Sequence, residues 1–253
     1  MAVTVALRSV TATRYVTPLR EGGSLPALVE ADDDGLYVVK FRGAGQGPGA
    51  LVAEVIVGEL ARATGLLVPE LVGIEIDPRL AAAEPDPEIQ ALIAASAGTN
   101  LGVDFLPGAL GYAAGAVGEP DPELAAAVVW LDALAMNVDR TARNPNLLLW
   151  HHRLWLIDHG AALYLQHRGL HPDDAERPFP AIAEHVLLPC AASIEEAHHR
   201  LAPRLSRELL QRVVDLVPPE WLVLAPAHVY VEYLERRVSG GAFAREAERA
   251  RSG

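Results

Sequence analysis

The pattern of apolar residues changes along this chain of 253 residues, and that change limits the possible folds more than any other feature. Before about residue 111 the pattern is that of short strands, rich in β-branched and aromatic residues and separated by the turn sequences "REGGS" and "DDDG". The predicted strands cover 14–19, 25–31, 36–41 and 70–76. A long helix is predicted from Gly47 to Gly65, because apolar residues recur there at helical spacing, and a shorter one over 86–98.

Beyond residue 111 helical patterns dominate. The predicted helices cover 121–137, 177–188, 203–216 and 227–250. The glycine-punctuated segment 99–111 is expected to be an extended connector between the two parts. We therefore predict an α+β, two-lobed fold, with a small antiparallel-sheet lobe over residues 1–103 and a mainly helical lobe over residues 104–253.

The composition excludes several classes of protein. Apolar residues make up 51% and charged residues 21%, which indicates a globular chain, and no run approaches the roughly 20 apolar residues of a membrane span. The single cysteine, Cys190, excludes a disulfide framework, and no Cys/His group has zinc spacing. The first residues do not resemble a signal peptide, so we expect a cytoplasmic protein without a membrane partner. The net charge of −12 argues against nucleic acid as a partner.

Three of the four asparagines, Asn137, Asn144 and Asn146, lie within ten residues of one another, beside Asp139. The strands 147–150 and 154–157 that follow are predicted to form a hairpin with a three-residue turn, which would bring Asp158 close to Asn144 and Asn146. A carboxylate and an amide carbonyl at one end of a hairpin are suited to Mg²⁺. The alternative is that these residues form hydrogen bonds within ordinary turns.

Lys40 is the only lysine beside 20 arginines, and it ends the apolar strand "LYVVK". A charge there needs a partner, and Glu54 in the following helix is the expected one. Together they could hold phosphate oxygens, although an ordinary salt bridge is the alternative. The turn containing Gly22, Gly23 and Ser24 could cover a nucleotide with its backbone N–H groups, although a plain hairpin turn explains these residues equally well.

In this order the segments resemble the protein-kinase-like fold. The sequence "NVDRTARNPNLL" (137–148) differs from the His-Arg-Asp loop of eukaryotic protein kinases and is nearer to the loop of phosphatidylinositol kinases. It is most similar to the HipA-like bacterial kinases, as is the segment from the lysine strand through a Gly/Gln loop into the glutamate helix (36–71). The resemblance covers about residues 12–165, and we find no motif in the remaining C-terminal residues.

The resemblance implies an ATP- and Mg²⁺-dependent phosphotransferase, with a serine or threonine of a protein as the phosphate acceptor. Lys40 would contact the phosphates of ATP, and Glu54 would orient it. Asp139 would accept the proton of the substrate hydroxyl, while Asn144 and Asp158 would bind Mg²⁺.

The resemblance also implies a hinge over 99–107 that contacts adenine. The residues expected to line it are Val103, Asp104, Phe105 and Leu106. His159 stands where many kinases have phenylalanine, and no Ala-Pro-Glu sequence follows it, which puts the usual control by an activation segment in doubt.

Two alternatives keep the same fold. One is a catalytically inactive relative that binds a nucleotide or a partner, and the other is a kinase acting on a small molecule or lipid. Arg140 and Arg143 would either steady the transferred phosphoryl group or form salt bridges within the loop. The paired histidines His198 and His199 would bind a metal ion poorly together, because neighbouring helical residues do not share a face. They therefore do not indicate a metal-dependent hydrolase.

Overall fold

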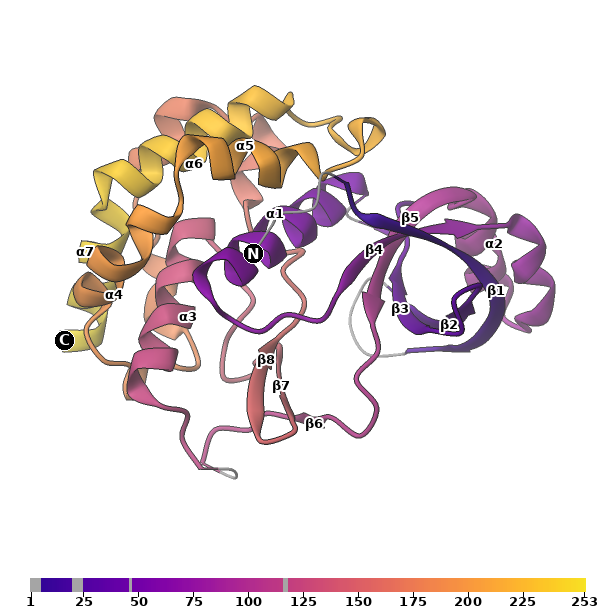
Figure 1. Ribbon diagram of the computed structural model, residues 1–253, viewed down its shortest axis with the longest axis horizontal. Helices are drawn as coiled ribbons and strands as arrows, with labels where there is room; N and C mark the ends of the chain where they lie inside the picture. The colour runs from indigo at the N-terminus through magenta and orange to yellow at the C-terminus, as the bar shows by residue number, and fades with distance from the viewer. Residues whose placement is uncertain (1–5, 20–24, 46, 116–117) are drawn as a thin grey trace.

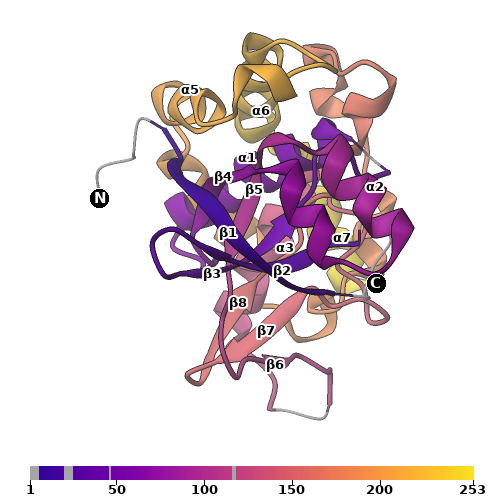
Figure 2. The same cartoon turned by 90° about the vertical axis from the view of Figure 1, so that its right-hand side faces the viewer.

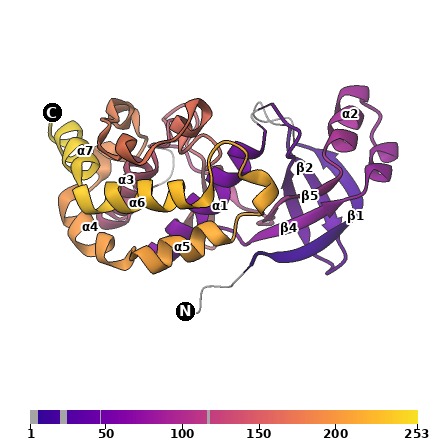
Figure 3. The ribbon, with the colours of Figure 1, turned by 90° about the horizontal axis from the view of Figure 1, so that it is seen from above.

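The computed structural model describes residues 6–19, 25–45, 47–115 and 118–253. It has a β-barrel near the N-terminus and a helical lobe that contains the C-terminus, with helix α1 (Pro48–Thr64) between them (Figure 1). Seen from above, the barrel and the helices lie side by side along the long axis of the molecule (Figure 3). The α+β fold expected from the sequence is confirmed. A boundary between two domains at residues 103/104 stays a prediction.

The barrel closes in the order β1-β2-β3-β5-β4. Its strands are β1 (Arg8–Pro18), β2 (Ala27–Ala31), β3 (Leu36–Lys40), β4 (Leu71–Ile76) and β5 (Gly98–Asp104). Neighbouring strands are antiparallel except β1 and β4, which pair in parallel. This parallel pair was not expected from the sequence. It forms because β1 begins six residues earlier than the predicted strand 14–19, and this additional part contacts β4 while the remainder, with two register shifts, pairs with β2.

Alternation along β3 determines which side chains face the barrel interior. Tyr37 and Val39 are buried inside, so Lys40 projects from the outer face. The barrel has its own apolar core, to which helix α2 (Pro87–Ala95) contributes Ile89 and Ile93, one helical turn apart. Figure 2 shows α2 beside the strands of the barrel. The 3₁₀ turn η1 (Pro78–Ala83) connects β4 to α2.

The prediction of an extended connector over 99–111 is wrong for its first part. Residues up to Asp104 form β5, which lies between β3 and β4. A Cβ at Gly102 would lie 2.7 Å from Cγ2 of Val72 on β4. The glycine that suggested a loop is therefore needed for the close approach of two strands.

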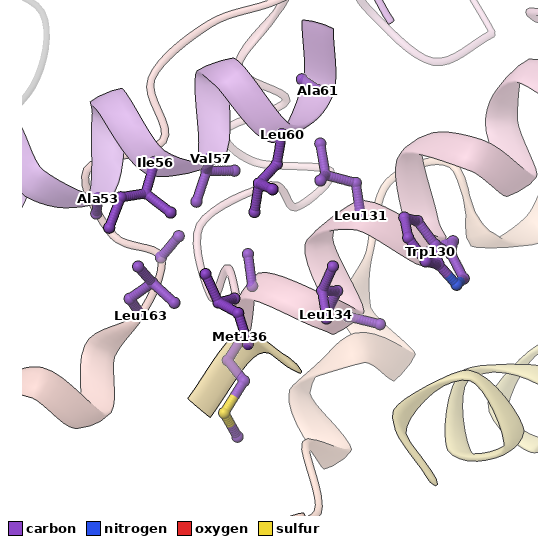
Figure 4. Packing of buried hydrophobic residues seen from close by; sticks show 14 of the residues in the cluster. Ala53, Ile56, Val57, Leu60, Ala61, Trp130, Leu131, Leu134, Met136 and Leu163 are labelled. Carbon is purple, nitrogen blue, oxygen red and sulfur yellow. The ribbon is translucent and has the colours of Figure 1, made fainter. Parts of the chain in front are cut away.

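The larger core forms where α1 meets α3 (Pro122–Ala135). Both helices are buried on nearly all sides, as expected for helices at the centre of a lobe. Figure 4 shows Val57 and Leu60 of α1 pointing towards Leu134 and Met136 at the end of α3. Because burying such a side chain contributes about 1.5–3 kcal/mol, this contact fixes α1 firmly against the helical lobe.

The C-terminal helices differ from prediction at two places. Segment 177–188 forms no α-helix, because Pro178, Pro180 and Pro189 remove amide donors, and it forms the 3₁₀ turns η4 and η5 instead. The predicted helix 227–250 is divided at Gly241, whose φ of 59° ends the first part.

The α-helices are α4 (Ile194–Leu201), α5 (Arg207–Asp215), α6 (Ala227–Gly240) and α7 (Ala242–Ser252). The 3₁₀ turns are η2 (Tyr164–Arg168), η3 (Pro172–Glu176), η4 (Pro180–Glu184), η5 (Leu188–Cys190), η6 (Ala202–Arg204) and η7 (Pro219–Trp221). No helix in the described ranges is long and apolar enough to span a membrane.

The predicted hairpin is present, but its turn is shorter than expected. Strands β7 (Leu147–Trp150) and β8 (Arg153–Leu156) are joined by His151 and His152 alone, both with positive φ, as in a type I′ turn. The short strand β6 (Leu110–Gly111) pairs with β7 on its other edge. The two-residue turn shifts the register by one residue relative to the prediction.

Candidate functional site

The predicted ion pair between Lys40 and Glu54 is present, and Asp158 joins it. Lys40 projects from the outer face of β3, Glu54 lies near the end of the second turn of α1, and Asp158 follows β8. The Lys40 ammonium donates a hydrogen bond to the Glu54 carboxylate and another, 2.7 Å long, to Oδ1 of Asp158. We name these three residues the open cluster. It joins the barrel, α1 and the helical lobe.

The open cluster is graded in exposure. The side chain of Glu54 is 2% exposed, that of Lys40 15% and that of Asp158 48%, so the cluster opens towards solvent at Asp158. Burial alone would lower the pKa of Lys40, but the two carboxylates raise it above its ordinary value. Burial would raise the pKa of Asp158, yet the Lys40 ammonium lowers it to about 2. Lys40 is therefore charged and Asp158 is ionised at neutral pH.

The backbone around Asp158 is adapted to this contact. Asp158 has a φ of 56°, which is uncommon for a residue other than glycine and is typical of functional sites. Two residues later, a Cβ on Gly160 would lie 3.1 Å from Oε1 of Glu54. The absence of a side chain at Gly160 leaves room for the Glu54 carboxylate.

The loop from residue 137 to residue 146 surrounds Asp139 with amides. Oδ2 of Asp139 accepts hydrogen bonds from Nδ2 of Asn144 at 2.8 Å and from Nδ2 of Asn146 at 3.2 Å. The backbone N–H of Asp139 donates to Oδ1 of Asn137 at 3.1 Å. Since Asn144 turns its NH₂ group towards Asp139, its carbonyl oxygen remains able to bind a cation. The contact between Asn146 and Asp139 was not predicted.

Behind this loop lies a buried network that sequence reasoning missed. Asp132 of α3 is fully buried and accepts hydrogen bonds from Nε of Arg140 at 2.5 Å and from Nε2 of His185 at 2.9 Å. Nη2 of Arg140 contacts Nδ1 of His159 at 3.2 Å. We name these four residues the closed cluster. One sequence signal could have revealed it, because Asp132 is a single charge within the apolar helix "LAAAVVWLDALA".

The closed cluster bears on the two alternatives considered for Arg140, of which it contains the salt bridge. Arg140 was considered for steadying a transferred phosphoryl group, but its guanidinium is buried against Asp132 and against backbone carbonyls, including that of Ile157. Arg140 therefore makes its contacts within the protein interior. Arg143 is exposed on the loop.

Only one of the two segments predicted to contact a nucleotide lies within the described residues. Gly22, Gly23 and Ser24 lie outside the described residues. In the other segment, the N–H of Asp104 donates to the carbonyl of Glu70 and that of Phe105 donates to the carbonyl of Leu36. Those two donors are therefore already paired with backbone carbonyls, one directly before β4 and one at the start of β3. Val103 lies within β5 and Leu106 is buried, and contact of the four residues with adenine stays a prediction.

Two further observations bear on ligands. Within the described ranges no group of three or more His, Cys, Asp or Glu residues could hold a metal ion, so a metal at Asp158 and Asn144 would need ligands from elsewhere, such as water or phosphate. A cavity of about 590 Å³ lies between α1 and α5, lined among others by Arg62 and Val213. No residue of the open cluster lines it.

Comparisons with known proteins agree with this geometry. A model of the HipA-like kinase family matches residues 13–239. The structure is similar to that of the Helicobacter pylori proinflammatory kinase CtkA, with 12% identity, a TM-score of 0.60, and coverage of 97% of this chain and 98% of that chain. It is also similar to the Golgi casein kinase with Mn and ADP bound, with 14% identity, a TM-score of 0.51, and coverage of 97% and 73%. At these identities the two structures establish the fold alone. No curated protein matches the chain.

Proposed function

This chain belongs to the HipA-like kinase family, and we propose that it is a cytoplasmic, ATP- and Mg²⁺-dependent kinase that phosphorylates a serine or threonine hydroxyl of another protein. The observation that carries the proposal is the contact of Lys40 with both Glu54 and Asp158. It joins a cation from the barrel, which would contact phosphate, to a carboxylate from the helical lobe, which would bind a metal, and phosphoryl transfer requires both.

The open cluster supplies the phosphate and metal contacts. In the proposal Lys40 contacts the α- and β-phosphates of ATP, and Glu54 holds the ammonium in place. Asp158 and the carbonyl oxygen of Asn144 bind Mg²⁺; carboxylate and amide oxygens are the hard donors that this ion prefers. A Mg²⁺ ion held there would supply positive charge that offsets the negative charge developing during transfer. The Golgi casein kinase, whose structure has Mn and ADP bound, supports nucleotide and divalent metal use within this fold.

Asp139 performs the proton transfer in this proposal. The substrate hydroxyl oxygen forms a bond to the γ-phosphorus, the bond from that phosphorus to the β,γ-bridging oxygen breaks, and ADP leaves. The hydroxyl proton passes to the Asp139 carboxylate. Hydrogen bonds from Asn144 and Asn146 to Oδ2 leave Oδ1 of Asp139 as the oxygen that can accept the proton.

The remaining assignments concern the nucleotide. Gly22, Gly23 and Ser24 are proposed to cover the phosphates. Val103, Asp104, Phe105 and Leu106 are proposed to line the adenine site.

Replacement of the proposed base tests the function. We expect Asp139→Asn to bind Mg-ATP with unchanged affinity in calorimetry and to lose transfer of radiolabelled γ-phosphate, because the amide cannot accept the hydroxyl proton. Asp215→Asn, on the surface of α5, is the matched control and should transfer phosphate at the wild-type rate. Transfer by Asp139→Asn at the rate of the control would refute the role of Asp139. A wild-type protein that binds Mg-ATP and transfers no phosphate to itself or to a panel of proteins would contradict the protein-kinase proposal and leave the two alternatives, an inactive relative and a kinase acting on a small molecule or lipid.

A further inference from the structure

The Asp132 carboxylate lies at the centre of the contacts that define the loop around Asp139. Its Oδ1 accepts a hydrogen bond from Nδ2 of Asn137 at 3.0 Å, and its Oδ2 accepts those of Arg140 and His185. Asn137 and Arg140 stand on either side of Asp139 in the sequence. One buried side chain on α3 therefore holds the loop before and after the proposed base.

The hydrogen bonds define the protonation state of the closed cluster. Nδ1 of His185 accepts the backbone N–H of Leu187 at 3.1 Å, so its Nε2 carries the proton donated to Asp132. Nδ1 of His159 accepts from Arg140, because a guanidinium has no acceptor. Both imidazoles are neutral in this arrangement, and burial lowers the pKa of each. Asp132 and Arg140 thus form a balanced buried pair.

The same cluster attaches the loop to the segment between η4 and η5. Thr141 forms a β-bridge with His185, and the N–H of Val186 donates to the carbonyl of Arg140 at 3.1 Å. Arg140 also donates to the carbonyl of Asn146, at the far end of the loop. The segment 159–192 contains no serine or threonine, so phosphorylation of these residue types within it cannot supply a counter-ion for Arg140. Asp132 supplies that counter-ion from inside the fold.

We propose that Asp132 is a positioning residue for phosphoryl transfer, which holds the backbone on both sides of Asp139 so that this carboxylate faces the acceptor hydroxyl. The proposal rests on the function proposed above. It predicts that replacement of Asp132 or Asn137 lowers the rate of transfer and leaves the binding of Mg-ATP unchanged. It also predicts that both residues protect the Asp139 amide from hydrogen exchange, whether or not the protein transfers phosphate.

Two variants test the proposal by different routes. Asp132→Asn removes the charge that balances Arg140, whereas Asn137→Ser removes the link between Asp132 and Asp139 without leaving a buried charge unpaired. For both we expect kcat to fall about 10²-fold, the loss associated with a misplacement of about 1 Å, with an unchanged Kd for Mg-ATP. We also expect faster hydrogen exchange at the Asp139 amide in NMR, with protection retained in α1 and α6.

A matched control separates positioning from general stability. Arg237 is equally buried and donates to the carbonyls of Ala133 and Leu134 on the same helix as Asp132. Arg237→Gln should lower the Tm while keeping kcat and the protection of the Asp139 amide at wild-type values. All measurements are made at a temperature at which each variant is folded by circular dichroism.

Each outcome decides the proposal. If Asp132→Asn does not fold, Asn137→Ser decides it. Wild-type kcat in the Asn137 variant, or an equal loss in the Arg237 control, overturns it. If the wild-type protein transfers no phosphate, the proposed function fails, and hydrogen exchange alone tests the positioning role. Protection of the Asp139 amide that is retained in Asn137→Ser then overturns that role, and protection that is lost supports it.

Discussion

The open cluster and the closed cluster contain the neighbouring residues Asp158 and His159, respectively, but they differ in their balance of charge. The open cluster has one formal positive charge, on Lys40, and two formal negative charges, on Glu54 and Asp158. The closed cluster contains one ion pair, Asp132 with Arg140, and two neutral histidines. The first is exposed at Asp158, whereas the second is buried throughout.

This difference in charge indicates which cluster is suited to bind a ligand. A site with an excess negative charge attracts a cation, and burial of the Glu54 carboxylate raises its pKa, as expected where negative charge is not fully compensated. A divalent ion at Asp158 would relieve this excess. The closed cluster is balanced and its donors and acceptors are largely paired, so it can contribute to the geometry of the fold but has no remaining charge for a ligand.

The largest expected effect is on stability in the closed cluster. Arg140→Met leaves the fully buried Asp132 carboxylate without its cation, and loss of one partner of a buried ion pair costs about 3–5 kcal/mol. Urea unfolding should show this loss. The double variant Arg140→Met/Asp132→Leu removes both charges and should recover much of it, because apolar replacement of a buried pair is often neutral.

The open cluster provides the contrast for that experiment. Lys40→Met should cost about 1 kcal/mol or less in unfolding free energy, because Glu54 can take up a proton and Asp158 is half exposed. A loss equal to that of Arg140→Met would show that both clusters serve stability and would remove the distinction between them.

The second prediction concerns binding at the open cluster. Lys40→Met should weaken Mg-ATP binding by about 1.5–3 kcal/mol, or roughly ten- to a hundredfold, because a hydrogen bond between charged groups is lost. Calorimetry measures the change. Arg14→Met, which removes an exposed cation elsewhere on the barrel, is the control and should leave the affinity unchanged. Equal affinities in the two variants would indicate that Lys40 forms an ordinary salt bridge and does not contact phosphate.

The third prediction is a dependence of stability on pH through His185. Burial lowers its pKa in the folded protein, with Asp132 and Arg140 as its charged neighbours, so the unfolded chain binds a proton below the ordinary value of 6.5 while the folded protein does not. Its contribution to stability is therefore lost as the pH falls from 7 to 5. We expect His185→Gln to be less stable than the wild type at pH 7 and to lose about 1 kcal/mol less between pH 7 and pH 5. Parallel pH profiles from urea unfolding would contradict this.

The sequence predicted the open cluster better than the closed one, for a physical reason. Lys40 and Glu54 belong to a strand and a helix with strong periodicity, and a single lysine among arginines marks a position where the type of cation matters. Asp132 and His185 are separated by 53 residues and meet through an irregular segment that prolines keep from forming an α-helix. Local patterns do not report such contacts.

The errors in the fold have the same origin. Gly102 reads as a loop residue, and only the position of Val72 on a neighbouring strand explains it. The hairpin register depended on whether the turn has two or three residues. The turn has two, because both His151 and His152 adopt a positive φ, which is uncommon for residues other than glycine. The parallel pairing of β1 with β4 likewise depends on the course of the whole barrel.

The smallest expected effect tests the space beside Glu54. In Gly160→Ala the new Cβ would lie 3.1 Å from Oε1 of Glu54, so the carboxylate must move by a few tenths of an ångström and its hold on Lys40 weakens. We expect Mg-ATP affinity to fall by about 0.5 kcal/mol, roughly two- to threefold, with little loss of stability. Gly111→Ala is the control, because the same addition there meets no atom within 4 Å. If Gly160→Ala binds Mg-ATP as tightly as Gly111→Ala, the position of Glu54 tolerates this displacement, and orientation of Lys40 by Glu54 matters less than the charge of Asp158.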